Sequence, residues 1–398
     1  MDLADRLERL GTETAFAVSA EAKGYAAAGN KLFPFHLGDI NLRTPSNIIE
    51  AALKAVRDGM TGYSPSEGIL PLREALSQDV GERRGVAYGP QNISIQPGGK
   101  PVISKFINAI LNPGDEVLYP NPGYPIYESQ IEFQGGKAVP YTFVETDDGF
   151  TIDLEQLRAS VNSRTKALIL NNYHNPTGAE CKENELSDLA ELALENDLWV
   201  LSDDAYYEIR YEGQSQSIAA IEGMRERTVI LYTFSKKYAM TGWRLGAAIG
   251  PEEIIQVFNK LNINDESCSN HFIQWAMVEV LKGSQDGPEQ ILETLKERRD
   301  VAVAGLNSIS GIRIASPNST FYLFPNVTRI LERKGLADVE QLRTETLRAT
   351  GVSFCSRIHF GRPMPGEQSH FIRFAYSGID VEEIREGMAA LKSYFESA

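Results

Sequence analysis

Short apolar runs alternate with amphipathic segments through the middle of this 398-residue chain. Five of these runs are typical of buried strands, at Glu116–Tyr119, Ala167–Leu170, Leu198–Ser202, Val229–Tyr232 and Leu245–Ile249. Between two of them, residues 183–196 place apolar side chains at helical spacing. Strands separated by helices predict βαβ units, and therefore an α/β fold with a mostly parallel sheet covered on both faces. In such sheets, ligands bind beyond the carboxyl ends of the strands.

The pattern changes after about residue 285. Two helices and two short strands are expected there, at Glu289–Leu306, Val339–Ala349, Thr320–Phe324 and Phe371–Ala375. These elements indicate a second, smaller α+β unit, with a boundary near Gly283–Gly287. We predict a large domain formed by residues 39–284 and a small domain formed by residues 1–38 and 285–398.

Charge and composition narrow the class of protein. The formal net charge of -15 argues against nucleic acid, whose binding depends on Lys and Arg neutralising phosphates. The three cysteines are scattered, without a CxxC pair or a metal-ligand spacing, so we expect a reducing compartment and no metal. The N-terminal segment lacks the apolar core of a signal peptide, and no apolar run approaches the ~20 residues of a membrane span. We therefore expect a cytoplasmic protein that binds neither nucleic acid nor membrane.

A glycine pair opens one helix. Gly98 and Gly99 precede Lys100 and Pro101, after which apolar residues recur at helical spacing as far as Leu111. Glycines in this position let an anion approach the backbone N–H groups at the positive end of the helix dipole. A tight turn that needs positive φ explains the same glycines, and no GxGxxG or P-loop motif is present. This segment alone leaves both interpretations open.

Lys236 lies in the segment that begins just after the strand predicted at Val229–Tyr232. A lysine at the carboxyl end of a strand points into the ligand crevice, where desolvation and neighbouring cations lower its pKa and allow Schiff-base chemistry. The hydroxyls of Thr233 and Ser235, with the guanidinium of Arg244, are suited to a phosphate. The alternative is a solvated basic pair, because lysine side chains are mostly exposed.

The segment around Lys236 resembles the lysine signature of class I/II aminotransferases, which has an arginine eight positions after the lysine. Thr233 stands where that family usually has Ser or Gly, and it keeps a hydroxyl. Further matches follow in the family's order from about Leu37 to the C-terminus. They are Leu37-Gly38-Asp39, Gly62-Tyr63-Ser64-Pro65, Gly98-Gly99-Lys100, Asn121-Pro122-Gly123-Tyr124-Pro125, Asn175-Pro176-Thr177-Gly178, Ser202-Asp203-Asp204-Ala205-Tyr206 and Phe371-Ile372-Arg373-Phe374.

This resemblance implies a pyridoxal 5'-phosphate (PLP) enzyme of fold type I, with Lys236 as the catalytic residue that holds the cofactor and moves the substrate's α-proton. The cofactor-binding residues that it implies are Tyr63, Gly99, Lys100, Tyr124, Asn175, Asp203, Tyr206, Thr233, Ser235, Lys236 and Arg244. The substrate-binding residues that it implies are Gly38, Lys100, Asn175 and Arg373. It also implies a homodimer in which Tyr63 reaches the partner's phosphate site.

The implied roles have chemical reasons. A carboxylate at Asp203 keeps the pyridine nitrogen protonated, so that the ring accepts electrons from the substrate carbanion. Asn175 and Tyr206 are expected to hydrogen-bond the phenolate oxygen, and Tyr124 to stack on the ring. Arg373 is expected to grip the substrate carboxylate with two parallel hydrogen bonds, which lysine does not offer. Each residue alone also fits an ordinary structural role, and the joint order favours the enzyme.

Lys100 bears on the choice of amino donor. In one bacterial aspartate aminotransferase subgroup, a lysine in the same GGK setting contacts the substrate's distal carboxylate. The resemblance therefore favours aspartate or glutamate as donor and a 2-oxo acid such as 2-oxoglutarate as acceptor, in a ping-pong cycle. A role for Lys100 at the phosphate alone fits equally well, and Thr14-Ala15-Phe16-Ala17 lacks that subgroup's threonine. The basic segment Ser356–Ser369 either shapes specificity or is a surface loop.

Two alternatives stay open. The same fold hosts PLP-dependent C–S β-lyases, because fold does not fix reaction. A non-catalytic PLP sensor is the other, as in regulators that carry an aminotransferase-like domain with a separate DNA-binding region. This acidic chain shows no spare segment of that size, and it keeps Lys236, Asp203 and Arg373. We therefore expect an amino-transferring enzyme whose substrates are small amino acids and 2-oxo acids.

Overall fold

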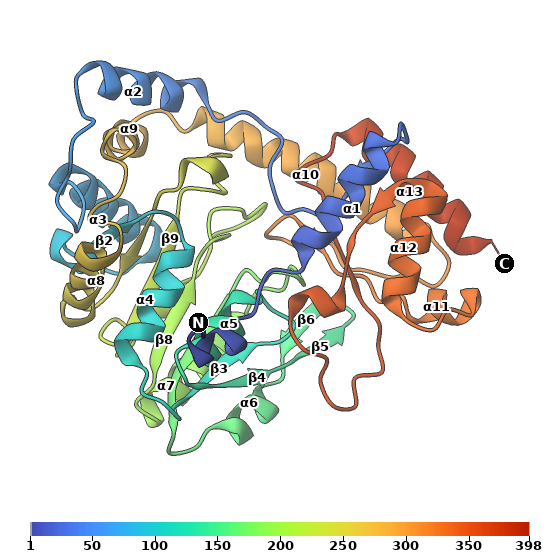
Figure 1. Cartoon of the computed structure of the whole chain (residues 1–398), viewed down its shortest axis with the longest axis horizontal. Coiled ribbons are helices and arrows are strands. Elements are labelled where there is room, and N and C mark those ends of the chain that lie inside the picture. The colour runs from blue at the N-terminus through green and yellow to red at the C-terminus, as the bar shows by residue number, and fades with distance from the viewer. Residues whose placement is uncertain (1, 398) are drawn as a thin grey trace.

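A seven-stranded sheet forms the centre of the computed structural model, which describes residues 2–397 (Figure 1). The strand order is β2-β10-β9-β8-β7-β3-β4. Their bounds are Ile93–Gln96 (β2), Glu116–Pro120 (β3), Lys137–Tyr141 (β4), Thr165–Leu170 (β7), Trp199–Asp203 (β8), Thr228–Thr233 (β9) and Gly246–Ile249 (β10). Strand β10 runs antiparallel to β2 and β9, and the remaining pairs are parallel. The mostly parallel sheet confirms the predicted fold class.

The five predicted strands are all present, with bounds that agree to within two residues. Two further strands of the sheet, β2 and β4, were not predicted. Strand β4 contains Pro140 and lies at the edge of the sheet, where the missing N–H of proline is tolerated. Its proline and its partly exposed side chains obscure the apolar run that marks the central strands.

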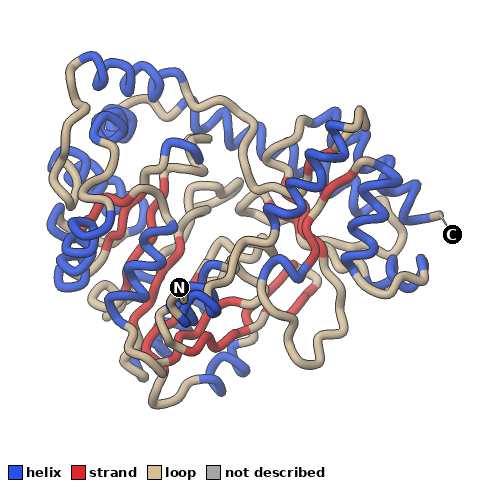
Figure 2. Tube along the Cα trace, in the orientation of Figure 1, coloured by secondary structure: helices blue, strands red, loops and turns tan. Residues whose placement is uncertain are grey.

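Helices cover both faces of this sheet, as predicted (Figure 2). They are α2 (Ser46–Arg57), α3 (Leu70–Arg84), α4 (Lys100–Ile110), α5 (Ile126–Phe133), α6 (Leu154–Ser160), α7 (Glu183–Glu195), α8 (Glu252–Asp265) and α9 (His271–Lys282). Alternate side chains of one strand point to opposite faces. In β9, Ile230 joins the core formed with α3 and α9, whereas Val229 joins the core formed with α4 and α8.

A second unit, formed by segments that precede and follow the sheet in sequence, lies beside it (Figure 1). Its helices are α1 (Ala15–Ala27), α10 (Asp286–Asn307), α11 (Thr328–Lys334), α12 (Val339–Thr350) and α13 (Val381–Glu396). Its strands form a sheet of order β11-β14-β13 and a pair, β1 and β12. The strand bounds are Phe33–Pro34 (β1), Tyr322–Leu323 (β11), Val352–Ser353 (β12), Cys355–Ser356 (β13) and Ile372–Ala375 (β14). An antiparallel hairpin, β5 (Phe143–Thr146) and β6 (Gly149–Ile152), completes the strands described.

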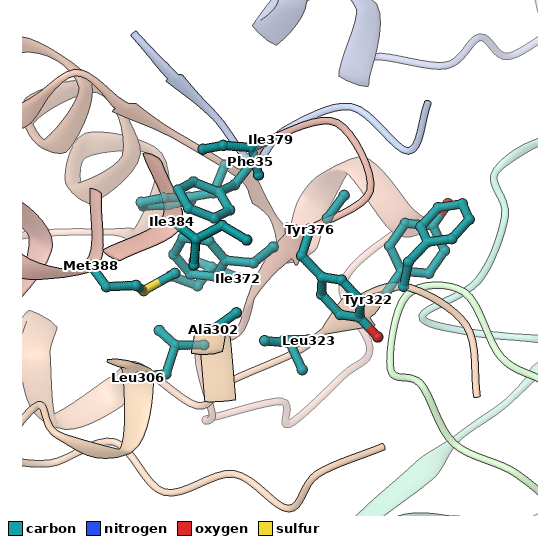
Figure 3. Packing of buried hydrophobic residues seen from close by; sticks show 14 of the residues in the cluster. Phe35, Ala302, Leu306, Tyr322, Leu323, Ile372, Tyr376, Ile379, Ile384 and Met388 are labelled. Carbon is teal, nitrogen blue, oxygen red and sulfur yellow. The ribbon is translucent and has the colours of Figure 1, made fainter. Parts of the chain in front are cut away.

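The core of the second unit brings together distant parts of the chain. Phe35 packs edge-on against Phe374 of β14, with ring centroids 5.3 Å apart. Figure 3 shows Phe35 close to Ile379, Ile384 and Met388 in this core. Burial of such side chains stabilises each by about 1.5–3 kcal/mol relative to exposure. The division of the chain into residues 39–284 and the remainder stays a prediction.

The elements predicted after residue 285 are present with small changes. Helices α10 and α12 match the two expected helices, and β14 matches the strand expected at Phe371–Ala375. The strand expected at Thr320–Phe324 is shorter, because Thr320 adopts a φ of 63°, in the left-handed region that interrupts extended backbone. Among residues 2–397, the helices lack a stretch with the length and apolar character needed to cross a bilayer.

Candidate active site

A cavity of about 350 Å³ opens at the carboxyl ends of the central strands. Asn171 follows β7, Asp203 ends β8 and Thr233 ends β9, and all three line the cavity. Tyr322 and Arg373 line it from the second unit. The cavity therefore lies where parallel sheets bind ligands, and its volume is typical of small-molecule sites, roughly 300–1,000 Å³.

The amine of Lys236 is held inside this cavity. Its Nζ donates a hydrogen bond to the carbonyl of Gly38, at 3.0 Å. The pKa of Lys236 is lowered from 10.5 to about 8, chiefly by desolvation; the positive charges of Arg373 and Arg244 act in the same direction, and Asp39 opposes them. A substantial fraction of the amine is therefore neutral near physiological pH, as a nucleophile or a base must be.

Asp203 is buried at the end of β8. Its carboxylate accepts a hydrogen bond from the hydroxyl of Tyr127, at 2.6 Å, and another from the backbone N–H of Ala205, at 3.1 Å. Burial raises the pKa of Asp203 to about 6, and the two hydrogen bonds act in the opposite direction. A cationic hydrogen-bond donor would stabilise the charged form of a carboxylate buried in this position. Tyr127, which lies three residues after the predicted Tyr124, was not predicted from the sequence.

The start of α4 meets the Arg244 loop. Gly98 has a φ of +101°, and a Cβ built there would lie 2.2 Å from Nη2 of Arg244. Gly99 is the N-cap of α4, and the hydroxyl of Thr233 donates to that of Ser235 at 3.0 Å. Backbone N–H groups at a helix start, two hydroxyls and a guanidinium thus converge on one end of the cavity. This donor set is suited to a phosphate.

Arg373 is buried at the opposite end. Its Nη1 donates to Oδ1 of Asn175 at 3.0 Å, and its Nη2 donates to the carbonyl of His36 at 2.7 Å. The guanidinium lies over the rings of Tyr322 and Phe360, with centroid distances of 4.5 and 4.6 Å. Its Nε is buried and has no hydrogen-bond partner among the described residues. These contacts fix the orientation of the guanidinium, and Arg373 lines the cavity as a cation suited to a carboxylate.

Two tyrosines close the cavity between Lys236 and Arg373. The hydroxyls of Tyr206 and Tyr322 are 2.6 Å apart. A Cβ at Gly38 would lie 2.2 Å from the Tyr322 hydroxyl, so this position requires glycine. Tyr322 was not predicted, because it belongs to a distant strand that only the folded chain brings to the site.

The N-terminal segment covers the cavity mouth. Glu13 forms an ion pair with Lys100 and accepts a hydrogen bond from the hydroxyl of Tyr124, at 2.6 Å. Thr14 Oγ1 lies 2.7 Å from Nδ1 of His359. Burial and the Glu13 carboxylate raise the pKa of Tyr124, so this hydroxyl keeps its proton. Sequence analysis did not single out Glu13.

Two further predictions concern Tyr63 and the segment Ser356–Ser369. Tyr63 is 88% exposed and does not line the cavity of this chain. In Ser356–Ser369, His359 lines the cavity, whereas Arg357 pairs with Glu367 at 2.9 Å. Arg362 pairs with Glu128 and Glu132. This basic segment is thus partly a wall of the site and partly a loop held by ordinary ion pairs.

Comparison with known proteins decides the family. Residues 31–391 match the family described as aminotransferase class I and II. The chain belongs to this family. It is therefore a PLP-dependent transaminase of fold type I, as the resemblance implied, and acts on amino acids and 2-oxo acids.

Relatives match over nearly the whole chain. A probable aspartate/prephenate aminotransferase of Aquifex aeolicus is 34% identical, covering 99% of this chain and 98% of the relative. The structure of Thermus thermophilus aspartate aminotransferase with maleate has a TM-score of 0.90 and 29% identity, covering 99% of both chains. An alanine aminotransferase from Pyrococcus furiosus has a TM-score of 0.91 and 28% identity, covering 99% of this chain and all of that one (100%).

The residues present fit PLP. The phosphate matches the donors around Gly98 and Arg244, where a side chain on Gly98 would close the space. The pyridinium matches Asp203, whose burial favours a cationic partner. The carbonyl carbon matches the Lys236 amine, whose pKa is lowered to about 8. Each reactive end of the cofactor thus has a counterpart in the cavity.

Replacing Gly98 tests the phosphate site. In Gly98→Ala, the new Cβ collides with the Arg244 guanidinium and forces a left-handed φ that costs an L-residue roughly 1–2 kcal/mol. We expect PLP binding to weaken by about tenfold or more, measured by absorbance titration of the apo-protein. Gly242→Ala is the matched control, because Gly242 lies in the Arg244 loop and has open space around its Cβ position. Equal affinities of the two variants would contradict the assignment.

The lowered pKa of Lys236 predicts the pH at which its amine becomes reactive. Because the folded-state pKa is about 8, the neutral amine becomes dominant as the pH rises through 8. Trace labelling of the cofactor-free protein with an amine-selective reagent, followed by mass spectrometry, should give half-maximal reactivity at Lys236 near pH 8. The exposed Lys260 supplies the internal reference. A midpoint at Lys236 above about pH 10, the ordinary range for lysine, would show that the site does not desolvate it.

Proposed function

We propose that this transaminase moves the amino group of aspartate or glutamate to a 2-oxo acid such as 2-oxoglutarate, in a ping-pong cycle. The observation that carries the proposal is that the Lys236 amine, with its lowered pKa, and the Arg373 guanidinium line one cavity. One group suits proton transfer, and the other suits a carboxylate. An α-amino acid presents both an α-proton and a carboxylate.

Lys236 acts as the general base and acid. When bound, PLP supplies a protonated ring that accepts the electrons left on the substrate's α-carbon. The neutral amine of Lys236 would take the α-proton from the substrate and return it to the cofactor carbon. The pKa of about 8 places this amine near the pH at which a base and its conjugate acid are both available. Asp203, held by Tyr127, keeps the ring nitrogen protonated.

Arg373 orients the substrate. Its guanidinium is fixed by Asn175 and His36 and by the rings beneath it, so little order is lost when a carboxylate binds. Gly38 lets the backbone approach the same carboxylate, because a side chain there would strike Tyr322.

The remaining predicted residues hold the cofactor. Gly99, Thr233, Ser235 and Arg244 bind its phosphate, while Tyr124 stacks on the ring. Asn175 and Tyr206 hydrogen-bond its phenolate oxygen. The placement of these side chains around one cavity supports these roles.

Lys100 supports the choice of an acidic donor. Its side chain lines the cavity and already pairs with a carboxylate, that of Glu13. We propose that Lys100 contacts the distal carboxylate of the substrate. The relatives named for aspartate, including one structure with the dicarboxylate maleate, support the same substrate class.

Substitution of Lys236 tests the mechanism. Lys236→Ala should lose at least about 10⁴-fold of the turnover with aspartate and 2-oxoglutarate, the upper range for acid–base catalysis. Lys236→Arg is the matched variant, because it keeps a cation whose pKa is too high for a base, and it should be equally inactive. Turnover is measured by coupled assay, and far-UV circular dichroism checks folding. Wild-type-like turnover of either variant would contradict the proposal.

We also propose a cytoplasmic homodimer, with Tyr63 completing the partner's phosphate site. Tyr63 is 88% exposed. The carbonyl oxygen of its neighbour Gly62 lies 3.2 Å from Nδ1 of His271, at the start of α9. Helix α2 buries Ile48, Ala52 and Ala55. The adjacent face, rotated by about 100° around the helix axis, exposes Ile49, Leu53 and Val56, which form one apolar stripe at helical spacing. A helix that is apolar on both faces is typical of an interface.

A charge in this stripe tests the dimer. Leu53 is 43% exposed, and Leu53→Glu should shift the protein from dimer towards monomer in sedimentation velocity at micromolar concentration, because a buried carboxylate opposes association. Leu194→Glu is the matched control, since Leu194 is 39% exposed on α7, outside the stripe. A wild type that sediments as a monomer, or a Leu53→Glu variant as dimeric as the control, would contradict the proposal.

A further inference from the structure

We propose that Glu13 is a specificity-determining residue that weakens the binding of dicarboxylic substrates by occupying Lys100. Substrates with an uncharged side chain are not penalised in this way. The inference rests on the amino-transfer function proposed above and concerns the same cavity. Within the chain, the carboxylate of Glu13 occupies the position beside Lys100 where a second carboxylate of the substrate is expected to bind.

Glu13 is tightly engaged in this position. Oε1 of Glu13 forms the ion pair with Lys100 and also accepts the Tyr124 hydroxyl at 2.6 Å. Its side chain is only 17% exposed, whereas that of Lys100 is 49% exposed. The ammonium of Lys100 also lies 5.8 Å from the centroid of the Tyr124 ring. The carboxylate therefore lies inside the cavity mouth, between the two side chains that face an entering substrate.

The chain on both sides of Glu13 is anchored. The short helix η1 (Asp5–Arg9) packs against α5, and Figure 1 shows the N-terminus beside that helix. The carbonyl of Gly11 accepts a hydrogen bond from Ser129 of α5, at 3.2 Å. Beyond Glu13, Thr14 contacts His359 in the second unit. The segment thus spans the two units across the mouth, and these contacts hold Glu13 at Lys100.

The cationic side chains that line the cavity show why the Glu13–Lys100 contact affects dicarboxylic substrates. Among the described residues, the Lys and Arg side chains that line the cavity are Lys100, Lys236, Arg244 and Arg373. In the proposed function, Lys236 and Arg244 serve the cofactor and Arg373 serves the α-carboxylate. Lys100 is the cation left for a second substrate carboxylate, and Glu13 already neutralises it.

A dicarboxylic substrate must therefore displace Glu13 or place its own carboxylate beside that of Glu13. Like charges at such short separation repel, and the partly enclosed mouth screens them less than bulk water does. A substrate with an uncharged side chain meets neither cost. The contact thus sets the ratio between dicarboxylic and uncharged substrates, while the chemistry at Lys236 stays the same.

Glu13→Gln tests the inference, because glutamine keeps the size of the side chain and can still accept from Tyr124. With pyruvate as a constant acceptor, kcat/KM for aspartate should rise by at least about fivefold, the upper range for partly exposed charge pairs. The kcat/KM for alanine should stay within about twofold, since no distal charge is involved. An unchanged ratio of the two values would overturn the inference.

Binding gives a second readout that needs no turnover. Maleate carries two carboxylates, and crotonate is a four-carbon acid with one. In calorimetric titration of the holoenzyme, Glu13→Gln should bind maleate at least about fivefold more tightly than wild type, with crotonate unchanged. Equal maleate affinities would overturn the inference. A protein that transfers no amino group would refute the proposed function alone, because the maleate comparison still tests Glu13.

Glu8→Gln is the matched control. Glu8 is an exposed carboxylate of η1 on the same N-terminal segment, so this substitution removes the same charge away from Lys100. We expect its aspartate-to-alanine ratio and its maleate affinity to match the wild type. The same gain in Glu8→Gln would mean that overall charge is responsible, and would overturn the assignment to Glu13.

Discussion

Desolvation of the Lys236 amine is the physical constraint on which the site depends. The amine lies at the carboxyl end of β9, donates to one backbone carbonyl, and faces the positive charges of Arg373 and Arg244. This environment disfavours the ammonium form, and it lowers the pKa to about 8. The surrounding fold must therefore be rigid enough to keep water away from Lys236. The packed strands β8 and β9, with the Tyr206 and Phe321 rings near the amine, provide this rigidity.

The same cavity depends on both units of the structure. The central sheet supplies Lys236 and Asp203, whereas Arg373 and Tyr322 come from the second unit. Gly38 connects the two, because its carbonyl accepts from Lys236 and its missing side chain leaves room for Tyr322. Because residues of both units line the cavity, a small shift between the units changes the surroundings of the Lys236 amine and of the Arg373 guanidinium. The N-terminal segment adds a third contribution through Glu13, which affects the choice of substrate.

Much of the fold and part of the site could be predicted from the sequence. Central strands are buried on both faces and read as apolar runs, and Asp203 and Thr233 end such strands, so their convergence on one cavity followed from sheet geometry. Strand β4 was missed because edge position and Pro140 remove that signal. Tyr127, Tyr322 and Glu13 were missed for another reason. Their positions depend on packing between distant segments, and each looks locally like an ordinary helix, strand or N-terminal residue.

In the proposed function, the chain carries an amino group on its cofactor between two substrates. The most direct measurement is an absorbance spectrum of the purified holoenzyme, first with aspartate alone and then with added 2-oxoglutarate. We expect aspartate to remove the absorbance band of the lysine-bound cofactor, and the 2-oxo acid to restore it. A band that no amino acid removes, or amino-acid breakdown with release of ammonia and no need for a 2-oxo acid, would contradict the proposed function.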